Sequence, residues 1–96
     1  MKKIKNLIII GKEYFDKVNG NSYHTATVFV NGLFFAKSNI EYGYGDQYIG
    51  TATDMLIKAG YLKDMGSIST VLWRYAEEKK ISLYTTKIEG LTKKQL

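Results

Sequence analysis

The sequence predicts an α+β domain with a mostly antiparallel sheet of three to four strands and two helices on one face, in the order ββ(β)ααβ. Two segments predict the sheet, because residues 23–30 and 33–42 are rich in aromatic and β-branched residues and flank Asn31-Gly32, the preferred pair for a tight hairpin. A helical apolar period after residue 46 predicts the first helix. The 96 residues have room for one domain, placed over residues 1–96.

The first strand is predicted from Lys5 to Ile10 and is ended by Gly11. Residues 14–18 are expected to continue it after a bend. Asn19-Gly20-Asn21 is predicted to be a turn, because Gly and Asn tolerate positive φ. This turn leads into the first strand of the hairpin.

The hairpin has two possible registers. A two-residue turn gathers one set of side chains on a common face: Val30, Val28 and Ala26 with Leu33, Phe35 and Lys37. A three-residue loop with a bulge at Gly32 aligns a different set: Ala26 and Val28 with Phe34, Ala36 and Ile40. The second register gives the cleaner apolar face, so we expect the bulge at Gly32.

The first helix is predicted over residues 46–59. Its apolar stripe repeats at intervals of three and four residues: Tyr48, Ala52, Met55, Ala59 and Leu62. Asp46 suits the N-cap, where its carboxylate would accept backbone N–H bonds and match the helix dipole. Gly60 suits the C′ position that follows the helix.

A second helix is predicted from Ser67 to Lys80, with Ser67 or Ser69 as its cap. One stripe carries its apolar residues: Ile68, Val71, Leu72, Tyr75 and Ala76. Ile81 to Ile88 alternates as a last strand, which Glu89 and Gly90 are expected to end before a mostly polar tail.

The stretch EYGYGDQY, residues 41–48, is either a strand-to-helix joint or a ligand-holding loop. As a joint, Gly43 and Gly45 allow sharp turns, Asp46 caps the helix, and Tyr42 and Tyr48 pack into the core. We favour the joint, because two glycines in this spacing make neither a dinucleotide fingerprint nor a P-loop.

The ligand interpretation uses the free N–H groups of a helix N-terminus and aromatic rings that stack on a base. Its candidate ligand-binding residues are Tyr23, His24, Tyr42, Tyr44 and Asp46. The carboxylate of Asp46 opposes a phosphate at this position. We expect no catalytic residue, because so many Ser, Thr and Asp residues could partner His24 that the sequence singles out none. We expect no metal or other cofactor, and a metal site is disfavoured because the single histidine has no second histidine or cysteine to share a metal.

Aromatic residues make up 14% of the chain, which is high for so small a domain and favours a subunit interface. Phe35 and Trp73 are the candidate interface residues, and a homo-dimer or higher oligomer is expected. A bare sheet face opposite the helices would be a further partner site. Its predicted residues are Thr25, Thr27, Phe29, Leu33, Phe35 and Lys37.

The formal net charge of +5 favours anionic partners, although 13 of the 14 basic residues are scattered lysines. A nucleic-acid-binding function would use six of these lysines: Lys2, Lys3, Lys5, Lys87, Lys93 and Lys94. The apolar run near the N-terminus is too short for a signal peptide or a membrane span. A cysteine-free chain without such segments is expected in the cytoplasm, with no membrane partner.

Taken together, SYHTATVFVNG, EYGYGDQYIGTA and the helix ending AGYL resemble a group of small proteins encoded by bacteriophages. The resemblance covers roughly residues 13–65. It implies a viral accessory protein located in the host cell and carries no assigned catalytic residue.

That resemblance makes a non-catalytic inhibitor of host antiviral defence the first functional hypothesis. Such an inhibitor would block a defence protein, as anti-CRISPR proteins do, or bind and sequester a nucleotide signal. A basic nucleic-acid-binding accessory protein is the alternative, and a small enzyme using His24 and Asp46 ranks last.

Overall fold

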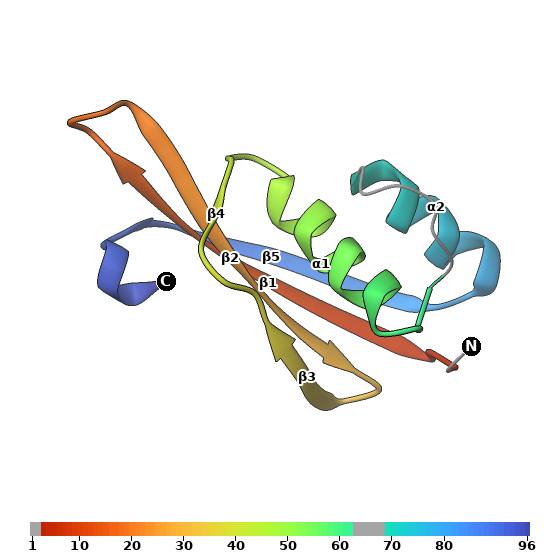
Figure 1. Ribbon diagram of the computed structural model, residues 1–96. Helices are drawn as coiled ribbons and strands as arrows, with labels where there is room; N and C mark the ends of the chain where they lie inside the picture. Colours follow the sequence, from red (N-terminus) through yellow and green to blue (C-terminus); the bar gives the residue numbers. More distant parts are fainter. Residues whose placement is uncertain (1–2, 63–68) are drawn as a thin grey trace.

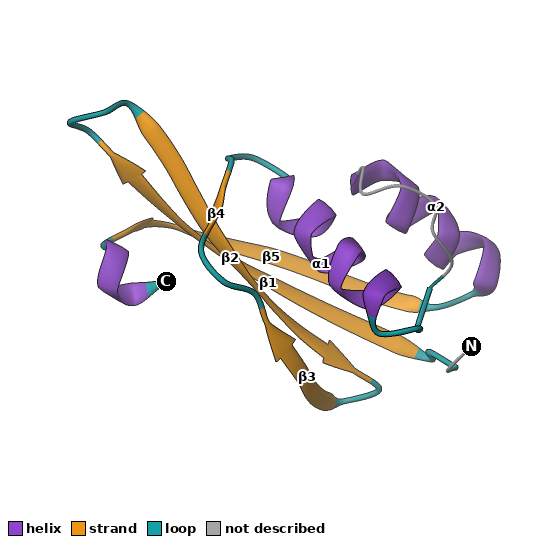
Figure 2. Cartoon of the chain, in the orientation of Figure 1, coloured by secondary structure: helices purple, strands orange, loops and turns teal. Residues whose placement is uncertain are grey.

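The computed structural model describes residues 3–62 and 69–96 and shows an α+β fold (Figure 2). Its elements, in chain order, are β1 (Asn6–Asp16), β2 (Asn21–Val30), β3 (Leu33–Lys37), β4 (Glu41–Tyr42), α1 (Gln47–Lys58), α2 (Ser69–Lys79), β5 (Ser82–Leu91) and the 3-10 helix η1 (Lys93–Gln95). The predicted fold class is confirmed. The described residues form five strands rather than three or four, because β4 pairs with β2 as a separate short strand.

The sheet has the order β3-β2-β1-β5, and β4 pairs with β2 beyond the end of β3. All pairs are antiparallel except β1 and β5, which are parallel. A parallel pair needs a crossover connection, and the segment that contains α1 and α2 supplies it. Both helices lie on one face of the sheet (Figure 1), which we call the helix face. The opposite face is called the open face.

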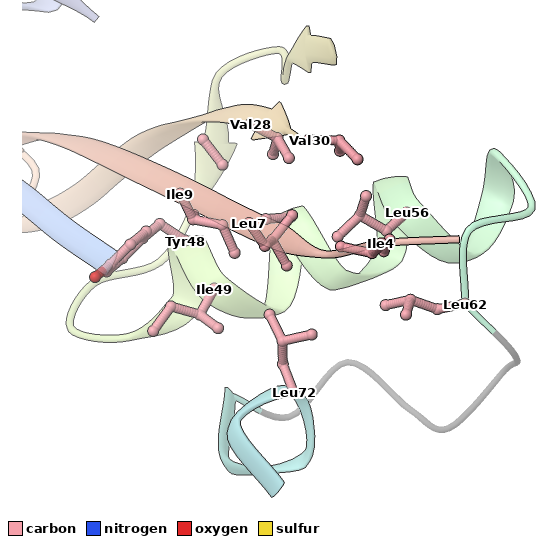
Figure 3. Close-up of a cluster of buried hydrophobic side chains, with 12 residues drawn as sticks. Ile4, Leu7, Ile9, Val28, Val30, Tyr48, Ile49, Leu56, Leu62 and Leu72 are labelled. Carbon is pink, nitrogen blue, oxygen red and sulfur yellow. The ribbon is translucent and has the colours of Figure 1, made fainter. Parts of the chain in front are cut away.

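The helix face carries the hydrophobic core (Figure 3). Cross-strand pairing puts Leu7 opposite Val30 and Ile9 opposite Val28. The buried side chains of this core are Ile4, Leu7, Ile9, Ala26, Val28, Val30, Tyr48, Ile49, Ala52, Leu56, Leu62 and Leu72. The alternation of buried and less buried residues along β1 is what a strand with one covered face requires.

Gly11 does not end the first strand, contrary to prediction, because β1 continues through it to Asp16. Gly11 lies on the helix face, and a Cβ atom placed there would be 2.5 Å from Cγ of the Tyr48 ring. The glycine therefore permits close approach of the first turn of α1 to the sheet. Here a glycine within a strand is needed for close packing against Tyr48 and does not end the strand.

The bulge predicted at Gly32 is wrong. Val30 pairs with Leu33 across a two-residue turn, in which Asn31 has φ 53° and Gly32 has φ 82°. Two successive positive φ values are characteristic of the type I′ turn that joins tight hairpins. Asn31 also accepts hydrogen bonds from the backbone N–H groups of Lys5 and Asn6, at 2.7 and 3.2 Å.

An irregularity lies one pair further along β2. Phe29 opposes Phe34, whereas Val28 opposes Ala36, so β3 has an additional residue at Phe35. The bulge places Ala36 on the helix face, as predicted. It leaves Phe34 on the open face, opposite to the prediction.

The predicted stripe of α1 is largely confirmed, because Tyr48, Ala52 and Leu62 are buried. The buried face of the helix also includes Ile49 and Leu56. Gly60 follows the helix with φ 83°, and its N–H donates to the carbonyl of Ile57 at 3.1 Å, as predicted for a C′ glycine.

α2 packs against α1 through part of its predicted stripe. Leu72 and Ala76 are buried, and Tyr75 is partly buried. The remaining predicted positions lie outside the residues whose side chains are described: Ser67, Ile68, Ser69 and Val71.

Glu89 and Gly90 do not end the last strand, contrary to prediction, because β5 runs to Leu91. The pairing between β1 and β5 shifts register between Lys12 and Tyr14, and Tyr14 then pairs with Leu91. Gly90 has φ 73°, a conformation that favours glycine at this irregularity. After β5, Lys93 of the C-terminal segment lines the same pocket as Asp16 and Asn19 of the β1–β2 hairpin.

Candidate functional site

The open face carries large apolar side chains. Cross-strand pairing sets four of them in one row: Phe34, Phe29, Ile8 and Tyr84. We call this set the apolar row. Phe34 is 62% exposed and Tyr84 is 60% exposed, although the row lies directly behind the hydrophobic core. A sheet with one solvated face normally places polar residues there, so the apolar row is a candidate binding surface.

A second row lies at the other end of the same face. Tyr14 pairs with Tyr23, and Tyr23 pairs with Tyr42. The rings of Tyr14 and Tyr23 lie 6.4 Å apart and 20° from parallel, and the ring of Tyr42 meets that of Tyr23 edge-on at 5.9 Å. We call these three residues the tyrosine row. At about 3.4 Å per residue along β1, it is about 20 Å from the apolar row.

Between the rows the open face is mixed in character. Its residues are Ile10, Lys12, Thr25, Thr27, Lys37, Thr86 and Ile88. The ammonium group of Lys37 donates to the backbone oxygen of Leu96 at 2.9 Å, so the C-terminal segment reaches this face. Thr25 is buried, and its Oγ1 atom has no hydrogen-bond partner among the described residues.

The open face thus contains Thr25, Thr27, Phe29 and Lys37, as predicted. Leu33 and Phe35 were assigned to it wrongly. Leu33 pairs with Val30 on the helix face. Phe35 packs against the core, and its ring meets that of Tyr61 edge-on at 5.2 Å.

The EYGYGDQY stretch joins β4 to α1 and is tied to three strands. The N–H of Gly43 donates to the carbonyl of Ser22 at 3.0 Å, and that of Gly45 donates to the carboxylate of Glu13 at 3.2 Å. The ammonium of Lys87 donates to the carbonyl of Gly45 at 3.2 Å. Gly43 has φ 138° and Gly45 has φ 65°, so glycine is required at both positions.

Lys87 is the charged centre of this joint. Its ammonium lies 3.4 Å from Glu13 and 2.8 Å from Glu89, while the lysine side chain is only 18% exposed. Desolvation lowers the pKa of Lys87, but the two carboxylates outweigh it and the net pKa is raised. The lysine is therefore engaged within the fold and does not present a free charge to a ligand.

His24 is a structural part of the same joint. It is 2% exposed, with Nδ1 3.2 Å from the carbonyl of Gly43 and Nε2 2.7 Å from Oγ1 of Thr51. Because a carbonyl only accepts, Nδ1 must donate, and Nε2 then accepts the Thr51 hydroxyl proton when the ring is neutral. Both ring nitrogens are occupied, and a ligand would have to displace one of these bonds.

The predicted side-chain cap at Asp46 is wrong. Asp46 occupies the N-cap position of α1, but its carboxylate makes no capping bond, and its φ of −90° and ψ of 11° differ from the extended N-cap conformation. Its backbone carbonyl accepts from Ile49 N–H at 3.0 Å. Tyr44 is exposed beside it.

Tyr42 was predicted to pack into the core and does not, because it is 70% exposed on the open face. The five candidate ligand residues therefore separate into two groups. His24, Tyr44 and Asp46 belong to the joint, whereas Tyr23 and Tyr42 belong to the tyrosine row. Successive residues of a strand point to opposite faces, which separates Tyr23 from His24.

A pocket of about 470 Å³ lies beside the tyrosine row. The described residues that line it are Tyr14, Asp16, Asn19, Tyr23, Ile40 and Lys93. Sequence reasoning identified only Tyr23 as a ligand residue here and placed Lys93 among general phosphate contacts. The alternation of β1 would have put Tyr14 opposite Tyr23, but only with the strand continued through Gly11.

The predicted interface residue Trp73 is half-exposed on α2. It borders a shallow groove of about 300 Å³ between α2 and β5, together with Ala76, Ile81 and Leu83. Trp73 and the apolar row are therefore separate surfaces, and Trp73 lies on the helix side of the sheet.

Within residues 3–62 and 69–96, no three histidine, cysteine, aspartate or glutamate side chains gather in a way that would hold a metal ion. No helix in this described part of the chain has the length and apolar character needed to cross a membrane. Comparison with known proteins finds no matching family model, curated protein or solved structure.

Proposed function

We propose that this chain is a small non-catalytic binding protein that inhibits a host antiviral defence system, and that it binds a defence protein through the apolar row of its open face. The exposure of Phe34 and Tyr84 on the sheet face opposite the helices is the observation that supports this proposal. The phage resemblance supplies the biological context, and the host cytoplasm is the proposed location.

The chemistry of the apolar row favours a protein partner. Ile8 and Phe29 are partly buried beside the exposed rings, so the row is a fixed, continuous apolar surface. Rigid aromatic anchors of this kind supply most of the binding energy at protein interfaces. The chain carries a net charge of +5, which favours a partner whose apolar patch has an acidic rim.

A nucleotide-sequestering site at the EYGYGDQY joint is less well supported. His24 is buried and hydrogen-bonded through both nitrogens, and Lys87 is paired with two carboxylates. The joint therefore lacks a free cation from Lys87 and a free donor from His24. Its geometry supports the joint interpretation that the sequence favoured.

The alternative, a general nucleic-acid-binding protein, is less well supported because the lysines that would bind the phosphates do not lie together. Lys3 and Lys5 precede β1, whereas Lys93 and Lys94 follow β5. Because β1 and β5 are parallel, the two pairs lie at opposite ends of the sheet. Lys2 lies outside the described residues. A phosphate backbone needs a continuous basic track, which these positions do not form.

The test compares phage plating on bacterial strains that carry individual defence systems. Expression of the chain is expected to raise plating on at least one strain. The Phe34→Ser/Tyr84→Ser double variant should lose most of that gain, because two interface anchors are worth about 2 kcal/mol or more each. Tyr44→Ser is the matched control, since it removes an exposed tyrosine at the joint and should retain the gain.

Purified defence protein from the responsive strain then gives the direct measurement. Calorimetry should show binding by wild type and by Tyr44→Ser, and binding weakened on the order of a thousandfold by the double variant. Full inhibition by a correctly folded double variant would contradict the proposal. Nucleic acid binding that the double variant abolishes would assign the row to the alternative function.

A second copy of the chain is the competing occupant of the apolar row. Native mass spectrometry distinguishes it, because a dimer that Phe34→Ser dissociates would make the row a self-interface. A dimer that only Trp73→Ser dissociates would place the predicted oligomer at the α2–β5 groove and leave the apolar row free for a partner.

A further inference from the structure

The pocket at the tyrosine row is a built feature of the fold. Three segments distant in sequence form it: the β1–β2 hairpin with Tyr14, Asn19 and Tyr23, the residues around Ile40, and the C-terminal segment with Lys93. Its volume of about 470 Å³ falls within the range of small-molecule sites, about 300 to 1,000 Å³.

The aromatic wall of the pocket is pre-organised. Tyr14 and Tyr23 are partly buried, are fixed opposite one another by strand pairing, and lie 20° from parallel. The ring of Tyr42 packs edge-on against the ring of Tyr23. Base stacking on tyrosine rings requires this kind of rigid aromatic surface and does not depend on base identity.

The polar wall provides a cation and both kinds of hydrogen-bonding group. Lys93 is exposed at the start of η1, and the backbone of that segment is fixed by a bond from Thr92 N–H to the Gln95 side chain at 2.8 Å. The side-chain amide of Asn19 contains both donors and an acceptor. An anionic group and a hydrogen-bonding edge are therefore complementary to this wall.

Asp16 is the one acidic residue among the described residues that line the pocket, and hydrogen bonds satisfy most of its charge. It accepts from the Asn19 side chain at 2.8 Å and from the backbone N–H groups of Val18 and Asn19 at 3.0 and 3.3 Å. The bond from the Asn19 side chain is the main cause of its lowered pKa, and the charge of Lys93 contributes. Three accepted bonds leave room for one more, from an N–H on the edge of a base.

We infer that this pocket binds a nucleotide unit, with the base against Tyr14 and Tyr23 and the phosphate at Lys93. The unit is either a free nucleotide or one residue of a single strand, because both present the same base and phosphate. This site is distinct from the apolar row, so the inference can be correct or wrong independently of the defence-protein proposal.

The binding test uses the purified full-length chain with AMP, GMP, CMP and UMP, and with oligothymidylate. Calorimetry at low salt should detect binding, and amide NMR shifts should centre on residues 14–23 and 93. Tyr14→Leu should weaken binding by at least about tenfold through lost stacking. Lys93→Gln should weaken it about fivefold and reduce its salt dependence.

Two matched variants control for general effects. Tyr44→Leu removes an exposed tyrosine at the joint, and Lys58→Gln removes an exposed lysine on α1; both should bind like wild type. Lys93→Gln keeps the test decisive if Tyr14→Leu does not fold, because the lysine is exposed. Tighter binding of the oligonucleotide than of the mononucleotides would identify a strand, and equal binding a free nucleotide.

Several results would overturn the inference. These are no binding by wild type at millimolar nucleotide, binding unchanged in both Tyr14→Leu and Lys93→Gln, or NMR shifts confined to the apolar row. Binding of tetramethylammonium with no binding of nucleotides would also overturn it, because three tyrosines and a carboxylate would then form a cation site.

Discussion

Ile9 and Ile10 are neighbours in β1 and have the same side chain, but they lie on opposite faces of the sheet. Ile9 is fully buried beneath the helices, whereas Ile10 is only partly buried on the open face. The helix face is apolar because it holds the fold together. The open face carries apolar side chains that no described helix packs against, so the exposed ones contribute less to folding and remain available for binding.

The first prediction compares these two isoleucines directly. Ile9→Ala should lower the free energy of unfolding by about 3 to 4 kcal/mol, because it leaves a cavity in a closed core. Ile10→Ala should cost about 1 kcal/mol, because water already reaches that side chain. Urea unfolding followed by circular dichroism measures both. Equal losses would show that a further chain covers the open face in solution.

The second prediction concerns the contact that holds α1 on the helix face. Gly11→Ala should cost about 2 to 3 kcal/mol, because the added Cβ collides with the Tyr48 ring, which cannot move without disturbing the core. In a Tyr48→Ala background the same change should cost less than about 1 kcal/mol. The double-mutant cycle measures this coupling by urea unfolding. Additive losses would mean that Gly11 is needed for the strand and not for Tyr48.

The contact between α1 and Gly11 also shows how far the sequence predicts the structure. The periodicity of residues 48–62 identified the buried side of α1, since burial and helical period act locally. Gly11 was interpreted as a strand end because nothing local distinguishes a breaking glycine from one that admits a distant ring. The prediction of the hairpin register was wrong for a related reason. The bulge lies at Phe35 within β3, where its position depends on the pairing with β2 and not on the turn residues.

The candidate site, too, was predicted only in part. Its individual tyrosines were recognisable from composition, but their grouping depends on which strand faces are paired. Tyr23 and His24 are adjacent in sequence and were assigned to one site, whereas the strand alternation separates them. The pocket beside Tyr14 requires β5 to continue past Gly90, and the sequence around that glycine predicted an end.

The third prediction concerns charge at the edge of the helix face. Because the pKa of Lys87 is raised in the folded state, its ion pairs contribute stability at neutral pH that is lost as pH rises through that pKa, in the alkaline range. Lys87→Met should cost about 1 to 2 kcal/mol at neutral pH, since Glu13 is left partly buried without its cation. The difference from wild type should shrink above about pH 10.5, the ordinary lysine value.

Thermal or urea unfolding at neutral and alkaline pH gives this comparison. Lys58→Met is the control, because Lys58 forms an exposed pair with Asp54 at 3.0 Å that is worth a few tenths of a kcal/mol. A Lys87→Met difference that stays constant with pH would assign the lost stability to packing of the lysine stem.

The smallest expected effect is on the open face, at Thr25. Within the described part of the chain its hydroxyl is buried with no partner, so it carries a desolvation cost that no hydrogen bond offsets. Thr25→Val replaces that hydroxyl by a methyl group of similar size and should raise the free energy of unfolding by about 1 kcal/mol. Thr27→Val, on the same strand and face but partly exposed, should change it by less than about 0.5 kcal/mol. Urea unfolding compares the two variants. A clear loss of stability in Thr25→Val would show that the Thr25 hydroxyl is hydrogen-bonded in solution. The open face at Thr25 would then hold no buried hydroxyl without a hydrogen bond.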